Sequence, residues 1–174
     1  MISNKLTLQS KERNYLISSI GLVLNEAREK AYSQVDRILV KTNWEVGRIL
    51  VEFEQKGKKK SEYGSQLLDK ISPELMDKFG PGFSAYNLRK MRGFYLAFQK
   101  WATVSPKLSW SHYRLILRVE EDSAKHFYIK ECENQNWSVR ELDRQINSML
   151  FERIALSKDY KGVLELSKKG QIIS

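Results

Sequence analysis

The side chains of this sequence that are best suited to binding a ligand are cations with no acidic residue near them in the sequence. No Asp or Glu occurs between Asp77 and Glu120. The cations inside that interval are Lys78, Arg89, Lys90, Arg92, Lys100, Lys107, Arg114 and Arg118. Lysine and arginine bind phosphate, and arginine also pairs with guanine edges. Because the turn Gly80-Pro81-Gly82 leads to Ser84, a good helix cap, the sequence predicts a capped helix that presents these cations.

The net charge of +9 is confined to the middle of the chain. Residues 56–119 hold 13 basic and 4 acidic side chains, whereas residues 1–55 hold 8 and 7, and residues 120–174 hold 9 and 10. A basic excess gathered in one region indicates a polyanionic partner such as DNA. The alternative is a solvated, lysine-rich face without a partner.

Catalytic chemistry finds no support in the residue types and their spacing. Cys132 is the only cysteine, and the sequence has two histidines, His112 and His126. These residues do not make up the ligand set of a zinc site, and they do not pair a nucleophile with a general base. Glu52 and Glu54 are the nearest match to the clustered carboxylates of a nuclease metal site, but their position at the end of a long helix indicates a solvated face. We therefore predict no catalytic residue, no metal site and no cofactor.

Length and composition favour one soluble domain or a domain with an extension. The chain has 174 residues, 41% of them apolar and 29% charged. No apolar run approaches the roughly 20 residues that cross a bilayer, and the first residues lack a signal-peptide core. The sequence therefore predicts a cytoplasmic protein that makes no membrane contact.

A long helix is predicted from Lys11 to about Gln55. Its apolar or small positions recur every 3.7 residues on average, which is helical periodicity. They are Leu16, Ile20, Val23, Ala27, Ala31, Val35, Ile38, Thr42, Val46, Ile49 and Phe53. Such a helix is longer than a small domain, so residues 1–55 are predicted to form a dimerisation arm that pairs with a second copy. A helical hairpin within one chain, broken near Tyr32-Ser33, is the alternative.

The remaining residues, 56–174, are predicted to form a compact helical domain. The lysine-rich segment Lys56-Gly57-Lys58-Lys59-Lys60 ends the arm. A short helix then runs from Ser61 to Ile71, and a new helix begins at Ser72-Pro73. Three further helices begin at serines 27 residues apart, each with an aromatic residue before the serine, as in a hydrophobic staple. These serines are Ser84, Ser111 and Ser138. We therefore expect an all-α fold with helix-turn-helix-like units.

A helical wheel divides the Ser84 helix into an inner and an outer face. The inner face carries Leu88, Met91, Phe94, Tyr95 and Phe98. The outer face and its flank carry the candidate DNA contacts, and the next helices add more. The predicted nucleic-acid-binding residues are Tyr86, Arg89, Lys90, Arg92, Arg114, Arg118, Arg140 and Arg144. Gly93 interrupts the outer face, where it permits a close approach of DNA or of another helix.

Five separated motifs resemble those of the YhcG-like N-terminal domain family. They are Trp44-x-x-Gly47-Arg48-x-Leu50, Tyr63-Gly64, Gly82-Phe83-Ser84-x-x-Asn87-Leu88-x-x-Met91-Arg92-x-Phe94-Tyr95, Leu108-Ser109-Trp110-Ser111-His112-Tyr113 and Trp137-Ser138-Val139-Arg140-Glu141-Leu142. The resemblance runs from about Tyr15 to Arg153. It implies a helical DNA-binding module that precedes a C-terminal PD-(D/E)XK nuclease-like domain in bacterial proteins. This chain lacks the nuclease half, so we do not expect it to hydrolyse DNA itself.

Two functional hypotheses follow. The first is a non-catalytic, homodimeric DNA-binding module whose partners are double-stranded DNA and the C-terminal nuclease domain of the full-length protein. The second is a protein-interaction domain that assembles a nuclease without binding DNA. In the second hypothesis, Trp44, Trp101 and Phe151 are interface anchors rather than core residues.

Overall fold

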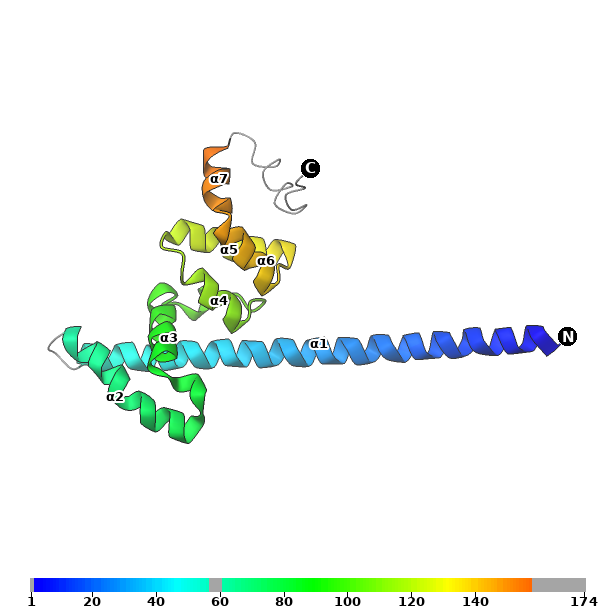
Figure 1. The fold of residues 1–174 in the computed structure, drawn as a ribbon, viewed down its shortest axis with the longest axis horizontal. Coiled ribbons are helices and arrows are strands. Elements are labelled where there is room, and N and C mark those ends of the chain that lie inside the picture. The colour runs from blue at the N-terminus through cyan, green and yellow to red at the C-terminus, as the bar shows by residue number, and fades with distance from the viewer. Residues whose placement is uncertain (1, 57–60, 158–174) are drawn as a thin grey trace.

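The computed structural model describes residues 2–56 and 61–157, with side chains from residues 10–55 and 66–157. Every regular element in these ranges is a helix, so the predicted all-α class is confirmed (Figure 1). Residues 57–60 of the lysine-rich segment and the side chain of Tyr63 lie outside the described residues. The division of the chain near residue 55 stays a prediction.

The first helix, α1 (Ile2–Lys56), is uninterrupted and reaches far beyond the rest of the molecule (Figure 1). No proline breaks it. It passes straight through Tyr32-Ser33, so the alternative of a helical hairpin is wrong. Only its last third packs on the domain, since Val40 is the first buried residue of the helix.

The second helix, α2 (Ser61–Phe79), continues through Pro73, so the prediction of a new helix at Ser72 is wrong. Leu68 and Leu75 lie on either side of the proline and belong to one apolar cluster. Burying both on one continuous helix offsets the roughly 3 kcal/mol that an interior proline costs. Ser72 is itself buried, and its hydroxyl donates to a backbone carbonyl of the following turn at 3.2 Å instead of capping a helix.

The turn after α2 and the next helix are as predicted. A 3-10 turn, η1 (Pro81–Phe83), leads into α3 (Ala85–Ala97). Gly80 has a φ of 94°, a left-handed conformation that favours glycine. Ser84 caps α3, because its Oγ accepts a hydrogen bond from the Asn87 N–H at 3.4 Å.

The crossing of α1 and α3 fixes the position of α3. A Cβ atom at Gly47 would lie only 2.1 Å from the Met91 carbonyl oxygen, so the two helices touch backbone to backbone at this glycine. Trp44, one turn earlier, is buried, and its Nε1–H donates to the Phe98 carbonyl at 2.6 Å. The predicted inner face of α3 is confirmed as core, with Tyr95 half-buried. The opposite face of α3 is left to solvent.

Four short helices complete the domain. After the 3-10 turn η2 (Trp101–Thr103) they are α4 (Trp110–Ile116), α5 (Asp122–Gln135), α6 (Val139–Asn147) and α7 (Leu150–Leu156). Their core side chains join those of α3 and the end of α1 in one cluster, which includes Phe94, Tyr113 and Leu142. A second cluster around Leu68 and Leu88 joins α1, α2 and α3.

The start of α6 is as predicted, whereas that of α4 is not. Ser138 and Glu141 form a capping box, with the Ser138 N–H donating to the Glu141 carboxylate at 2.7 Å. The cap of α4 is Ser109, so the prediction of Ser111 is wrong. His112 Nδ1 accepts a hydrogen bond from the Ser109 N–H at 3.2 Å. His112 thus occupies the third helical position of a capping box, where Glu or Gln is the usual residue. The equal spacing of three serine caps is therefore not kept.

Candidate nucleic-acid interface

The outward face of α3 carries the side chains predicted to meet DNA, but two of its arginines are already paired. Arg89 Nη2 lies 2.7 and 2.8 Å from the two carboxylate oxygens of Asp69 on α2. Arg92 Nε lies 3.0 and 2.8 Å from those of Glu54 near the end of α1. Both acids lie outside the acid-free interval of the sequence. The expectation of an unopposed positive field is therefore wrong for Arg89 and Arg92.

Tyr86 and Lys90 remain available on this face. Tyr86 is 56% exposed, and Lys90 Nζ lies 5.6 Å from the centroid of its ring, within cation–π range. Lys90 makes no ion pair in the part of the chain that the structure describes. The two side chains form an aromatic and cationic surface next to the paired arginines.

A groove of about 450 Å³ lies beside this face and reaches the start of α5. It is lined by Arg89, Lys90, Gly93, Leu96, Ala97, Leu117, Asp122 and Lys125. A Cβ atom at Gly93 would meet no atom within 4 Å, so packing inside this chain does not explain the glycine. The charge pattern did not single out Lys125, whose Nζ lies 2.7 Å from Asp122 Oδ1. Only the tertiary fold brings it beside α3.

The outward face of α6 holds two arginines that form no ion pair with another described residue. Arg140 and Arg144 lie one turn apart and are both exposed, as predicted. Leu142 and Gln145 are buried on the inner face, which fixes the direction of the two arginines.

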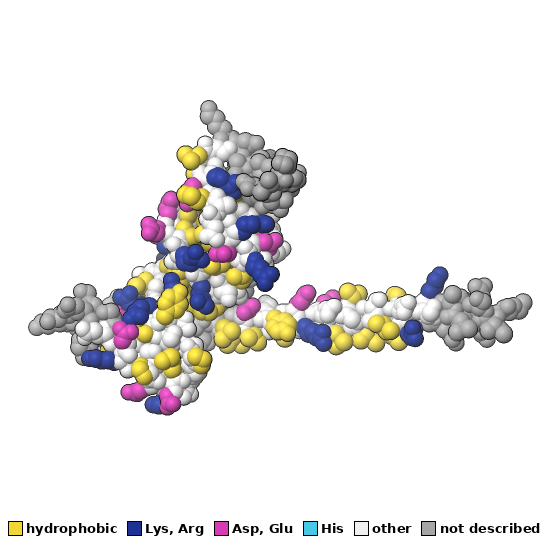
Figure 2. Space-filling view, in the orientation of Figure 1, with side chains coloured by type: hydrophobic (Ala, Val, Ile, Leu, Met, Phe, Trp, Pro, Cys, Tyr) yellow, Lys and Arg dark blue, Asp and Glu magenta, His cyan; other side chains and the backbone are white. Residues whose placement is uncertain are grey.

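Arg114 and Arg118 lie at and just after the end of α4, next to α6. Both are exposed, and Arg118 Nη1 lies 3.2 Å from Asp143 Oδ1 on α6. This ion pair joins the end of α4 to α6, whose residue Asp143 lies between Arg140 and Arg144 in sequence. The exposed side chains of Arg114, Arg118, Arg140 and Arg144 are here called the α4–α6 surface. Arg118 is thus a third predicted cation with an acidic partner. Figure 2 shows Lys and Arg side chains over the upper lobe of the molecule, with a few acids among them.

A tight turn and one histidine position α6. Asn136, with a φ of 52°, ends α5 in the left-handed conformation that asparagine tolerates. The buried Trp137 follows, and Ser138 then caps α6. His112 Nε2 donates to the Trp137 carbonyl at 3.0 Å, since its Nδ1 serves as the acceptor for Ser109. The α5–turn–α6 unit thus consists of two helices joined by a short turn, and its second helix presents Arg140 and Arg144.

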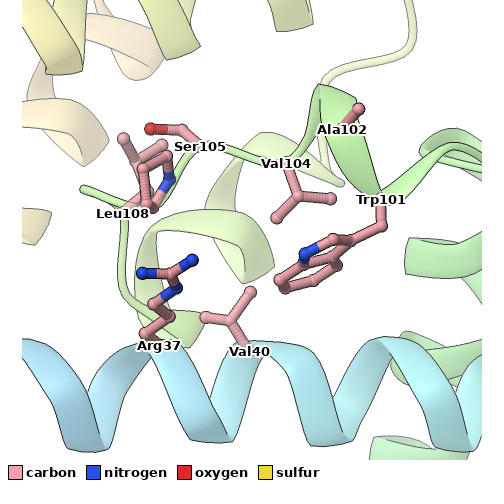
Figure 3. A pocket seen from close by; sticks show the side chains of 8 residues that line it. Arg37, Val40, Trp101, Ala102, Val104, Ser105 and Leu108 are labelled. Carbon is pink, nitrogen blue, oxygen red and sulfur yellow. The ribbon is translucent and has the colours of Figure 1, made fainter.

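A second, smaller cavity of about 130 Å³ lies where α1 leaves the domain (Figure 3). Arg37 and Val40 reach it from α1, and Trp101 reaches it from η2. Trp101 is half-buried and packs on Trp44 with ring centroids 5.7 Å apart. Phe151 is half-buried against the same core. Trp44 is a core residue, so its proposed role as an interface anchor is wrong.

Cys132 and Glu54, which were considered as candidates for catalysis, are buried or held in an ion pair. Burial raises the pKa of the Cys132 thiol to about 12, and the adjacent Glu131 adds to the effect, so the thiol stays protonated at neutral pH. Glu54 is held by Arg92. The described residues contain no group of three or more His, Cys, Asp or Glu side chains that could hold a metal ion. Within the same ranges, no helix combines the length and apolarity that spanning a membrane requires.

Known proteins supply a family match and a longer relative. Residues 19–153 match the family described as the DUF1016 N-terminal domain. A protein of Escherichia coli (strain K12) named "Putative nuclease YhcG" is 35% identical over an alignment of 175 positions. The alignment covers 82% of this chain and 47% of that protein. The chain therefore spans about half the length of this curated relative. No solved structure matches the chain.

Proposed function

Because this chain belongs to the DUF1016 N-terminal domain family, as the resemblance in its motifs indicated, we propose that it is the non-catalytic DNA-binding module of a nuclease. Hydrolysis is assigned to the additional length of the E. coli protein, whose name is "Putative nuclease YhcG". The partners in this proposal are cytoplasmic double-stranded DNA, a second copy of the chain and the C-terminal nuclease domain of the longer protein.

Arg140 and Arg144, which are exposed on the second helix of the α5–turn–α6 unit and form no ion pair within residues 10–55 and 66–157, carry the proposal. In helix-turn-helix proteins the second helix enters the major groove. Contacts to phosphate supply affinity there, and arginine can also pair with guanine. Arg114 and Arg118 extend the same surface beside α6. The α4–α6 surface is therefore the main proposed contact with DNA.

The outward face of α3 supplies the second part of the proposed contact. Tyr86 and Lys90 lie next to each other on this face and are proposed to contact DNA directly. Lys90 gives up no ion pair with another described residue when it does so. Arg89 must exchange Asp69 for phosphate, and Arg92 must exchange Glu54. An exposed ion pair such as Arg89–Asp69 contributes only about 0–1 kcal/mol, so that exchange costs little. The Glu54 side chain is only 17% exposed, so separating it from Arg92 costs more. These two arginines are expected to add less affinity than Arg140 and Arg144.

Fluorescence anisotropy with a labelled duplex tests the proposal. The double variant Arg140→Ala/Arg144→Ala is expected to lose at least tenfold in affinity, because each phosphate contact releases counterions when it forms. The affinity of the unaltered chain should fall steeply between about 50 and 200 mM salt. The double variant should show a shallower dependence on salt.

Arg28→Ala/Lys30→Ala is the matched control. It removes the same charge from two exposed residues of α1, far from the α4–α6 surface. We expect its affinity to stay within about threefold of the unaltered chain, since only long-range attraction changes. Equal losses in the two double variants, or binding that does not respond to salt, would refute the proposed interface.

The exposed part of α1 favours a second candidate function, which is assembly without DNA binding. Between residues 10 and 39 the helix presents a series of large apolar side chains to solvent. Exposed apolar surface of this extent marks an interaction site. Sedimentation of the Arg140→Ala/Arg144→Ala variant separates the two functions: self-association should be unchanged while DNA binding fails. A chain that self-associates and binds no duplex at low salt would favour assembly alone.

A further inference from the structure

The helix α1 has two apolar faces on opposite sides. The face toward the domain carries Val40, Trp44, Gly47 and Val51, which pack on α3 and its neighbours. The opposite face carries the apolar and small positions identified from the sequence, here called the α1 stripe. Its members are Leu16, Ile20, Val23, Ala27, Ala31, Val35, Ile38, Thr42, Val46, Ile49 and Phe53. The domain therefore covers one face of α1 and leaves the stripe on the other, apart from Val46, which packs partly on the cluster around Leu68.

The α1 stripe does not stop where the domain begins. Ile20 is 50% exposed and Ile38 64% exposed on the free part of the helix, while Phe53 is still 59% exposed behind the domain. Of the stripe members beside the domain, Val46 is half-buried and Ile49 remains exposed. Figure 2 shows hydrophobic side chains along the free part of α1. Whatever covers the stripe must lie along nearly the whole helix.

We propose that a second copy of this chain covers the α1 stripe, with its own α1 running in the opposite direction. This goes beyond the expectation of a dimer by fixing the face, the direction and the register. It does not depend on DNA binding. In the proposed register, Leu16 of one copy lies opposite the partner's Phe53, and Ile20 lies opposite the partner's Ile49.

The spacing of the stripe fits a copy of itself turned end for end. Counted forward from Leu16, the steps between members are 4, 3, 4 and 4 residues, and counted back from Phe53 they are the same. The first five members from each end therefore meet layer by layer in two antiparallel helices, and the central Val35 meets the partner's Val35 one residue out of register. No charged residue belongs to the stripe, so no layer buries an ion.

Side-chain size favours the antiparallel direction over the parallel one. In the antiparallel register the small Ala31 lies opposite the partner's Ile38, and Ala27 lies opposite the partner's Thr42. Parallel copies in register would place both alanines against their own copies and Phe53 against the partner's Phe53. That arrangement leaves two successive layers of small residues and an overfilled layer at Phe53. The antiparallel register fills the Ala31 layer with Ile38, so that only the Ala27–Thr42 layers are small, and it separates the two Phe53 side chains.

The area available matches that of a stable dimer. The stripe spans about 55 Å at 1.5 Å per residue. Its large members are half exposed or more apart from Val46, and burying them with their flanks removes on the order of 700 Å² per copy. Specific dimers bury about 800 Å² per partner. The α1 stripe is thus large enough to hold two copies together without help from the domain.

Two matched aspartate variants of the full chain test whether the stripe is the interface. Ile20→Asp places a charge on the stripe, and Leu22→Asp places one on a side chain that is 65% exposed but lies on the opposite side of α1. In sedimentation experiments, Ile20→Asp is expected to weaken dimerisation at least 100-fold, because the dimer buries two copies of the charge. Leu22→Asp should stay within about threefold. An unaltered chain that sediments as a monomer, or equal effects of the two variants, overturns the proposal.

Disulfide formation tests the direction. A mixture of the Ile20→Cys and Ile49→Cys variants, distinguished by a size tag, is expected to give the mixed disulfide and little of either like-with-like product. Each variant cross-linking to itself would show a parallel pair and overturn the antiparallel register. Cys132 does not interfere, because it is buried inside the domain. Omitting either variant from the mixture controls for random collision.

Discussion

Two glycines in helix interiors have opposite surroundings, which predicts opposite effects of the same substitution. A Cβ at Gly47 would collide with the Met91 carbonyl oxygen, so Gly47→Ala must push α1 and α3 apart at a cost of about 3 kcal/mol. A Cβ at Gly93 would meet nothing, so Gly93→Ala should raise the free energy of unfolding by about 0.5–1 kcal/mol through helix propensity. Urea denaturation of both variants measures this, and changes of the same sign would contradict it.

Glu141 makes the stability of the α6 start depend on pH. The Ser138 backbone N–H, followed by its hydroxyl, lowers the pKa of this carboxyl from its usual value. Since the folded-state pKa is the lower one, the stabilisation is fully present above the usual value of 4.5 and is lost as the pH falls below it. Glu141→Gln should therefore lower the melting temperature at about pH 6, and the difference from the unaltered chain should shrink toward about pH 3. A difference that is constant with pH would contradict this role.

The helices differ in how far local sequence determines them. The starts of α3 and α6 were predictable, because Ser84 and Ser138 bond to backbone N–H groups within their own first turns. The length of α1 followed from its unbroken periodicity. The course of α2 through Pro73 was not predictable, because the burial that holds it together comes from distant elements. The candidate site shows the same limit: exposure of Arg140 followed from the helical wheel, whereas the pairing of Arg89 with Asp69 arises only in the fold.

His112 joins two elements of the proposed DNA-binding unit, and its removal should loosen both. Its Nδ1 accepts from Ser109 at the start of α4, and its Nε2 donates to the Trp137 carbonyl before α6. His112→Ala removes both bonds and is expected to lower the free energy of unfolding by about 1–2 kcal/mol. His126, exposed on α5, provides the control: His126→Ala should change stability by less than about 0.5 kcal/mol. Similar losses in the two variants, measured by thermal unfolding, would contradict the role of His112.

At the scale of the whole molecule, α1 sets the distance between two domains in the proposed antiparallel dimer. The part of α1 that packs on its own domain is centred near residue 46. In the proposed register that position lies opposite residue 23 of the partner, so the two domains are offset along the shared axis by 23 residues, or about 35 Å. Because each domain covers the face of α1 opposite the stripe, the two domains also lie on opposite outer sides of the helix pair. Their DNA-binding surfaces are therefore farther apart than this axial offset, and farther apart than one turn of B-DNA, which is about 34–36 Å.

If both proposals hold, affinity should depend on duplex length in a stepwise manner. Duplexes of about 10 base pairs can engage only one domain, whereas engaging both domains of the proposed dimer requires a duplex longer than about 20 base pairs, or two helical turns. The second contact then becomes intramolecular, so we expect affinity to rise at least 100-fold across this range instead of in proportion to length. Ile20→Asp should keep the affinity for the short duplex and lose the step, because it separates the copies without touching the α4–α6 surface. Arg140→Ala/Arg144→Ala should weaken binding at every length. A step that survives in Ile20→Asp would show that the two domains are not coupled through α1, even where each binds DNA.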